Sequence, residues 1–324
     1  MSPAGQQAWA WFKRIAPWAL AALVLTLVAR QARTVDWPEV WVALQALTLL
    51  QVLAAAGLAL LSYGLVASFD LIGRRLTAHT LSAPRTLGIA AICYAFNLNF
   101  GALVGGFGLR LRLYMRGGLS AQTVAQVITH SMVTNWLGYL WVAGAVLLIA
   151  PPRLPDSWAL GELGLRAMGG VMVALALGYL FLCTWSRQRE LVWRGHTLAL
   201  PGARLAGLQA LMGGASWLLI GAIAWSLFGG RVDYPTVLGA LLLAAVAGVL
   251  THVPAGLGVL EAVFVATLAH ALPATEVLAT VLAYRAAYYL LPLALALPAY
   301  AWSEAGASPR VGSTKVQPRP TNGI

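Results

Sequence analysis

The sequence contains little charge and little cysteine. Only 10% of its 324 residues are charged, whereas 60% are hydrophobic, and the mean hydropathy is +0.77. Soluble domains carry about 25% charged residues, so this composition excludes a soluble protein and indicates an integral membrane protein. The two cysteines, Cys93 and Cys183, both lie in apolar runs. We expect them to pack as small hydrophobic side chains, and they do not indicate a redox compartment.

The signatures of membrane enzymes are also missing. The chain contains no H-E-x-x-H zinc motif, no G-x-S-G serine motif and no cluster of cysteine and histidine at metal-ligand spacing. Its "GGFG" pattern is followed by no strand and no Lys-Ser/Thr pair, which excludes a phosphate-binding loop. We therefore expect no catalytic residue, no metal, no cofactor and no ATP hydrolysis.

Long uncharged runs divide the chain. A helix needs about 20 residues to cross the hydrocarbon core, and most of the runs reach that length: 40–69, 86–109, 121–152, 167–186, 205–230, 234–260 and 286–303. They predict an all-α, polytopic bundle of about eight transmembrane helices with one or two re-entrant or broken helices. Residues 1–303 are predicted to form this single domain. Its first helix, Ile15–Ala29, shows no convincing signal-peptide cleavage site. Residues 304–324, rich in Pro, Gly and charge, are predicted to be a disordered cytoplasmic tail.

The excess of positive charge fits loops on the cytoplasmic side of a membrane. The 21 Lys and Arg residues exceed the 10 Asp and Glu residues by 11, and membrane proteins keep such an excess in cytoplasmic loops. If every apolar run crossed once, the basic clusters at 74–85 and 187–204 would face opposite sides. The conflict disappears if residues 87–109 enter the membrane and return to the same side.

Residues 87–109 have the composition of such a re-entrant segment. Irregular backbone inside a membrane needs polar partners and permissive residues, and this segment supplies Asn97, Asn99, Gly101, Gly105, Gly106 and Gly108. With this re-entrant segment, both termini are predicted to be cytoplasmic. Residues 236–272 then form either two crossings or a second re-entrant hairpin.

The stretch "HVPAGLGVLEAVFV", residues 252–265, predicts a helix that breaks and resumes. Pro254 removes a backbone donor, and Gly256 and Gly258 permit unusual backbone conformations. A helix that restarts within the membrane points its N-terminal N–H groups into a cavity, where transporters bind anionic groups. A simple packing kink is the structural alternative.

Glu261 follows this break directly and requires a partner. A carboxylate in a membrane segment costs about 2.5–3.5 kcal/mol on insertion scales. Arg285 is the candidate, because both residues lie at similar depth if their helices start at the turn near "PATE". The pair is either a structural bridge or a site at which arginine binds phosphate and glutamate meets a cation or proton. Tyr284, Tyr288 and Tyr289 would add hydroxyl groups there, unless they form an interfacial aromatic belt.

A second candidate site is the basic run "RLRLYMR", residues 110–116. The guanidinium groups of Arg110 and Arg112 could hold a phospholipid phosphate, or anchor the chain to anionic lipids without specificity. His130, Asn135 and His252 are further candidates for a polar path, although each could equally be an interhelical hydrogen-bonding residue.

Three motifs in this order resemble a known family: "GGFGLRLRLYMRGG" at 105–118, "PAGLGVLE" at 254–261 and "YRAAYYLLP" at 284–292. They look like the transmembrane region of lysylphosphatidylglycerol synthase/flippase proteins, whose family includes stand-alone bacterial inner-membrane members without the synthase domain. The resemblance covers about residues 10–303 and implies a multi-pass protein of the bacterial cytoplasmic membrane. Ala255 replaces one glycine of the family's usual pair. The family's motif residues correspond by position to Pro254, Gly256, Gly258, Glu261, Arg285 and Tyr288.

The resemblance implies a lipid translocase and not an aminoacyl transferase. The expected substrate is a phospholipid or a related anionic or aminoacylated amphiphile, and the expected binding residues are Arg110, Arg112, Gly256, Gly258, Glu261, Arg285 and Tyr288. The alternative is a non-catalytic partner or scaffold for a separate lipid-modifying enzyme, and a lipid transferase is disfavoured because no base or metal site is evident. Other expected partners are anionic lipids and a second copy of the chain, but no nucleic acid.

Overall fold

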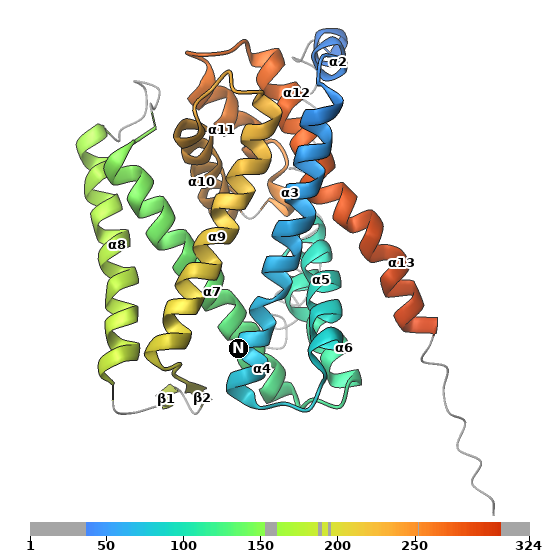
Figure 1. Ribbon diagram of the computed structural model, residues 1–324, viewed down its shortest axis with the longest axis vertical. Coiled ribbons are helices and arrows are strands. Elements are labelled where there is room, and N and C mark those ends of the chain that lie inside the picture. Colours follow the sequence, from blue (N-terminus) through green and yellow to red (C-terminus); the bar gives the residue numbers. More distant parts are fainter. Residues whose placement is uncertain (1–36, 153–160, 187–189, 194–195, 252, 306–324) are drawn as a thin grey trace, which may run out of the picture.

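The computed structural model describes residues 37–152, 161–186, 190–193, 196–251 and 253–305 (Figure 1). Within these ranges, the first half of the chain forms α2 Trp37–Gln45, α3 Leu49–Ala67, α4 Phe69–Thr77, α5 Ala83–Phe100, the π-helix η1 Ala102–Leu109, α6 Arg110–Arg116 and α7 Ala121–Ile149. The second half forms α8 Glu162–Trp185, β1 Glu190–Trp193, β2 His196–Ala199, α9 Ala203–Phe228, α10 Tyr234–Thr251, the 3-10 turn η2 Pro254–Gly256, α11 Val259–Leu268, α12 Ala274–Arg285, the π-helix η3 Ala286–Leu290 and α13 Leu291–Ala305.

These elements confirm an all-α polytopic membrane protein. Six helical stretches of the described residues are long and apolar enough to cross a membrane. Large apolar side chains such as Leu50 and Leu163, 77% and 82% exposed, cover the outer surface as lipid-facing residues do. The only sheet in the described ranges is the short antiparallel pair β1–β2. The expected first helix, Ile15–Ala29, lies outside the described residues, as do residues 306–324 of the expected tail.

The first re-entrant hairpin consists of α5, η1 and α6, residues 83–116. Figure 1 shows α5 starting at the lower end of the molecule and α6 returning there. The Tyr114 hydroxyl oxygen of α6 lies 3.4 Å from the Thr86 carbonyl oxygen near the start of α5, so both ends of the hairpin lie together. Gly101, with φ of +87°, makes the reversal. The expected entry and return of residues 87–109 is therefore confirmed.

The second re-entrant hairpin consists of α10, η2 and α11, residues 234–268, and it starts from the opposite end. An ion pair between Arg231, just before α10, and Glu276, at the start of α12, joins the two segments that flank the hairpin. Since five residues separate α11 from α12, the start of α10 and the end of α11 lie at one end of the molecule. Two full crossings would also return to that end, but α11 has only 10 residues and is too short to cross the hydrocarbon core. Residues 236–272 therefore form a hairpin and not two crossings.

Inside the bundle, the tip of the first hairpin contacts both the break η2 of the second hairpin and the π-helix η3. The Asn99 side chain, near the end of α5, donates to the Tyr289 carbonyl oxygen of η3 at 3.1 Å. This carbonyl lies in a π-helix, where the regular α-helical bonding is interrupted. The Tyr94 and Tyr288 hydroxyls lie 3.0 Å apart. The site described below is thus formed by segments that enter from opposite ends.

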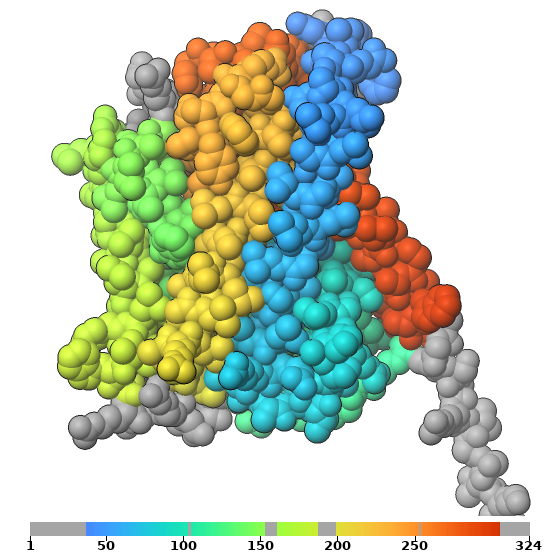
Figure 2. All heavy atoms as spheres, viewed as in Figure 1, coloured from blue at the N-terminus to red at the C-terminus, as the bar shows by residue number. Residues whose placement is uncertain are grey.

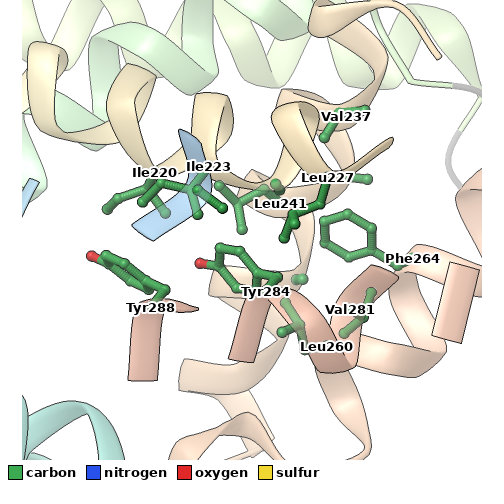
Figure 3. Close-up of a cluster of buried hydrophobic side chains, with 14 of the residues drawn as sticks. Ile220, Ile223, Leu227, Val237, Leu241, Leu260, Phe264, Val281, Tyr284 and Tyr288 are labelled. Carbon is green, nitrogen blue, oxygen red and sulfur yellow. The ribbon is translucent and has the colours of Figure 1, made fainter. Parts of the chain in front are cut away.

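The main core packs behind these tips and fixes α9, α10, α11 and α12 against one another. Figure 3 shows Ile220, Ile223 and Leu227 of α9 facing Leu241, Leu260, Phe264, Tyr284 and Tyr288. Elsewhere, α7 and α9 approach closely at Gly138, where an added Cβ would lie 2.1 Å from the Gly213 carbonyl carbon. Small residues at such crossings are the usual means of packing helices in membranes.

A substitution at Gly105 tests how closely the two arms of the first hairpin pack. A Cβ on Gly105 would lie 2.0 Å from the Asn97 backbone nitrogen, so we expect Gly105→Ala to cost about 3 kcal/mol of unfolding free energy by overpacking. The unfolding transition in detergent micelles, followed by circular dichroism, measures this loss. Gly88→Ala on the same hairpin is the control, because its Cβ would meet nothing within 4 Å. Equal stability of the two variants would contradict the close contact.

Candidate functional site

The candidate site is built on the broken backbone between α10 and α11. Ala255, Gly256 and Gly258 all adopt left-handed conformations, with φ of 55°, 58° and 77°. Such a conformation costs an L-residue such as Ala255 about 1–2 kcal/mol, so surrounding contacts must hold it. Because the break interrupts the helix, the carbonyl groups of Ala255 and Gly256 point away from a helical ladder and need other donors.

Arg285 supplies those donors. Its Nη1 donates to the Ala255 carbonyl oxygen at 2.9 Å, and its Nη2 donates to that of Gly256 at 2.8 Å. The same guanidinium forms an ion pair with Glu261, with Nε to Oε1 at 2.5 Å and Nη2 to Oε2 at 3.1 Å. These four bonds use four of the five N–H donors of the guanidinium. Arg285 therefore pins the break and neutralises Glu261 at the same time.

Glu261 occupies the first turn of α11 and is itself fully engaged. Its Oε2 accepts the Gly258 N–H at 2.9 Å, which caps the start of the helix in the manner of a capping box. A carboxylate at a helix N-terminus is also favoured by the helix dipole. The side chains of Glu261 and Arg285 are only 16% and 10% exposed. The structure thus confirms the expected pair.

Tyrosines and a cavity lie close to this pair. The Arg285 Cζ lies 5.3 Å from the centre of the Tyr289 ring, within cation–π range. A cavity of about 240 Å³ lies beside the break, bounded by polar groups and by apolar side chains of α9 and α10; its polar and glycine lining includes Tyr94, Asn97, Gly256, Tyr284, Tyr288 and Tyr289. Of the predicted site residues, Gly256, Gly258, Glu261, Arg285 and Tyr288 are therefore brought together.

Arg110 and Arg112 lie elsewhere and apart from each other. Arg110 is buried, with its Nη2 3.3 Å from the Asp70 Oδ1, and the Tyr114 hydroxyl donates to the Asp70 Oδ2 at 2.7 Å. Arg112 is exposed and pairs with Glu304 near the end of α13, at 2.9 Å. The two arginines do not form one phosphate fork, and neither contacts the break in the described residues.

His79, in the turn that follows α4, lies beside this Asp70 cluster. Its ring packs against Tyr114, with 6.2 Å between the ring centres. Burial, followed by the charge of Arg74, lowers the pKa of His79, which favours a neutral imidazole. The neutral imidazole adds no charge beside the Asp70–Arg110 ion pair, whose two charges balance each other.

The remaining candidates do not join the site. His130 is buried within α7, and neither ring nitrogen has a hydrogen-bond partner among the described residues. The Asn135 carbonyl oxygen accepts the Trp217 indole N–H at 3.1 Å, which is a packing contact between α7 and α9. Cys93 and Cys183 are buried and form no disulfide. His252 lies outside the described residues.

The sequence interpretation missed Asp70 and the bonding role of Tyr94. Asp70 is the first charge after the uncharged run 40–69, and a carboxylate at that position was a signal for a buried partner. Tyr94 carried no such signal, because its hydroxyl meets Tyr288 only through the three-dimensional fold.

Comparison with known proteins gives a family match and similar relatives. The family described as Lysylphosphatidylglycerol synthase TM region matches residues 14–296 of the chain. Inner membrane protein YbhN of Escherichia coli (strain K12) is 40% identical over 295 residues, which cover 90% of this chain and 92% of YbhN. Uncharacterized protein slr0712 of Synechocystis sp. (strain PCC 6803) is 28% identical over 293 residues, 88% of this chain and 91% of its own.

The buried pair gives a double-mutant test. We expect Arg285→Met to cost about 3–5 kcal/mol of unfolding free energy, because it leaves the Glu261 carboxylate buried without its partner. The second change Glu261→Gln should restore part of this loss, since the neutral amide still caps the Gly258 N–H. Thermal unfolding in detergent micelles measures each variant.

The exposed pair between Arg231 and Glu276 is the matched control. Arg231→Ala should cost less than about 1 kcal/mol, as expected for a solvent-exposed ion pair. If the double variant loses as much as the sum of its two single changes, the buried groups are not coupled.

Proposed function

The chain belongs to the family of the lysylphosphatidylglycerol synthase transmembrane region, and from this membership we propose that it translocates a phospholipid or a related anionic or aminoacylated amphiphile across the bacterial cytoplasmic membrane. One observation carries the proposal. Two re-entrant hairpins enter from opposite ends and meet beside a buried ion pair and a cavity of about 240 Å³. Transporters of several folds place their substrate sites at such interrupted helices.

The site offers a lipid head group polar and charged partners, which hydrocarbon does not provide. A charged group at the bilayer centre costs several kcal/mol unless it finds partners. Leu260, in the first turn of α11, lines the cavity, as do Tyr94 and Tyr288, whose hydroxyls lie 3.0 Å apart. A phosphate would be attracted by the helix N-terminus and by Arg285, and an amino group on the lipid by Glu261.

Exchange of partners is the step that this geometry requires. Arg285 already makes four hydrogen bonds, so it can hold a phosphate in a bidentate way only by releasing Glu261 or the carbonyl groups of the break. Glu261 then takes up a proton or a head-group cation, because an isolated carboxylate would be costly there. In this mechanism the ion pair is the resting state, and substrate replaces one member at a time.

The orientation follows from the distribution of charge. The ends of α4 and α6 and the starts of α5 and α9 lie at the lower end of Figure 1, called the basic end from here on. These helix ends carry Arg74, Arg75, Arg85, Arg116 and Arg204. By the positive-inside rule this end faces the cytoplasm. The Escherichia coli relative is named an inner membrane protein, which supports a multi-pass location in that membrane. With no nucleotide-binding motif in the sequence, lipid movement is downhill or coupled to an ion gradient.

Lipid movement in proteoliposomes tests the proposal. We expect the wild type to equilibrate a fluorescent phosphatidylglycerol between the leaflets, measured by dithionite quenching. Arg285→Lys keeps the charge but loses the planar fork, and Glu261→Gln keeps the cap but loses the charge. Each change should slow translocation at least tenfold.

Arg231→Lys, at the exposed pair, is the control and should leave the rate unchanged. The circular dichroism spectrum of every variant checks that it folds. A wild type no faster than protein-free vesicles, or folded site variants as fast as wild type, would favour the scaffold alternative. In that case a folded double variant, Glu261→Gln with Arg285→Met, should still support lipid modification in cells.

A further inference from the structure

A groove separate from the broken helix opens at the basic end, between α5, α6 and the C-terminal end of α13. Its volume is about 230 Å³, and it is lined by Arg85, Gly88, Ile89 and Ile92 of α5, Leu113 and Arg116 of α6, and Ser303 of α13. Figure 2 shows the end of α13 beside the surface of α5 and α6. None of its residues belongs to the site at Arg285.

The groove has an excess of positive charge. Arg85 is exposed and has no acidic partner among the described residues. Arg112 and Arg116 share a single carboxylate, Glu304, with Nη to Oε2 distances of 2.9 and 3.1 Å. The chain beyond Glu304 adds Arg310, Lys315 and Arg319 and no Asp or Glu. Arg85 and Arg116 line the groove and Arg112 lies next to it at Glu304. Among the described residues these three guanidinium groups have one side-chain carboxylate, Glu304, as ion-pair partner, an excess of two positive charges.

Glu304 binds both Arg112 and Arg116 through one oxygen, Oε2. Its Oε1 is buried and has no hydrogen-bond partner among the described residues, although a carboxylate can accept bonds on both oxygens. A phosphate diester offers two charged oxygens as well, and arginine binds such groups through paired N–H bonds. Glu304 thus occupies the place at which an anionic ligand would meet Arg112 and Arg116.

The wall of the groove next to these charges is apolar: Gly88 is exposed, and the edges of Ile89 and Ile92, 9% and 8% exposed, reach the surface beside it. Arg85, Gly88, Ile89 and Ile92 follow the i, i+3, i+4, i+7 spacing of one helix face. This face runs about 10 Å along α5 from the charged end toward the membrane interior. A Cβ on Gly88 would meet nothing within 4 Å, so the glycine leaves room on the wall. The arrangement places the arginines, which can bind an anionic head group, at the end of the apolar wall of the groove.

We propose that this groove binds an anionic phospholipid of the cytoplasmic leaflet, with its phosphate between Arg85 and Arg116 and one acyl chain along Gly88, Ile89 and Ile92. The proposal rests on the proposed function, for which the groove is the entry site on the cytoplasmic side. Glu304 competes with the lipid phosphate for Arg116. A free phosphate ion shares the head-group chemistry, but it does not need the apolar wall.

Equilibrium binding of a fluorescent short-chain phosphatidylglycerol to the detergent-solubilised full chain tests the groove. We expect Gly88→Leu to weaken binding at least tenfold, because the side chain fills the wall. The paired change Arg85→Gln with Arg116→Gln should weaken it by a similar factor. Glu304→Gln should strengthen binding severalfold, because it frees Arg112 and Arg116.

Gly178→Leu, on the lipid-facing helix α8, is the matched control. Its Cβ would also meet nothing within 4 Å, so it should bind as wild type does. Thermal unfolding of Gly88→Leu confirms that the variant folds. If Gly88→Leu folds and binds as tightly as wild type, or if Gly178→Leu weakens binding equally, the groove is not the lipid site.

Competition separates a lipid from a free ion. Unlabelled phosphatidylglycerol should displace the probe at micromolar concentration, whereas inorganic phosphate should not displace it at millimolar concentration. Displacement by both at the same concentration would replace the lipid with a bare phosphate site. Binding that depends on Gly88 in a protein that moves no lipid would keep the groove and overturn only the translocase function. If the wild type moves lipid and Gly88→Leu binds the probe as tightly as wild type, the translocase function stands and the groove proposal is overturned.

Discussion

The structure depends on the hydrogen bonding of a broken backbone inside an apolar medium. A backbone carbonyl left unpaired in hydrocarbon costs several kcal/mol, and the break at residues 254–258 exposes two of them. Arg285 donates hydrogen bonds to both carbonyl oxygens, at 2.9 and 2.8 Å. Its positive charge in turn requires the Glu261 carboxylate. The cap that Glu261 places on Gly258 then starts α11. One guanidinium therefore fixes the break, the carboxylate and the next helix together.

The rest of the bundle holds that guanidinium in place. Arg285 ends α12, and the π-helix η3 follows it directly. The Tyr289 carbonyl of η3 is bonded by Asn99 from the opposite hairpin, and Tyr288 is bonded by Tyr94. The core between α9 and α11 supports the other side of the hairpin (Figure 3). Because contacts come from both ends of the molecule, a movement of either hairpin changes the surroundings of Arg285.

The sequence predicted those parts of the site that follow from the free-energy cost of a charge or a helix break inside the membrane. A lone carboxylate beside a proline and two glycines demands a cation, and Arg285 was available at matching depth. The basic run was interpreted less well. Residues two apart on a helix point in different directions, so Arg110 turns inward to Asp70. Arg112 and Arg116, four apart, share a face and both reach Glu304. Asp70, Asn99 and Tyr94 act through contacts between distant segments, which no local pattern encodes.

The two hairpins also have an electrical consequence. At the tips, neither hairpin crosses the bundle, whereas the helical stretch Ala274–Glu304 continues past them. Moving one elementary charge across the membrane potential is worth about 2.3 kcal/mol per 100 mV. In the proposed translocation, a lipid with net negative charge would move that charge across the membrane potential, whereas a zwitterionic lipid would move no net charge.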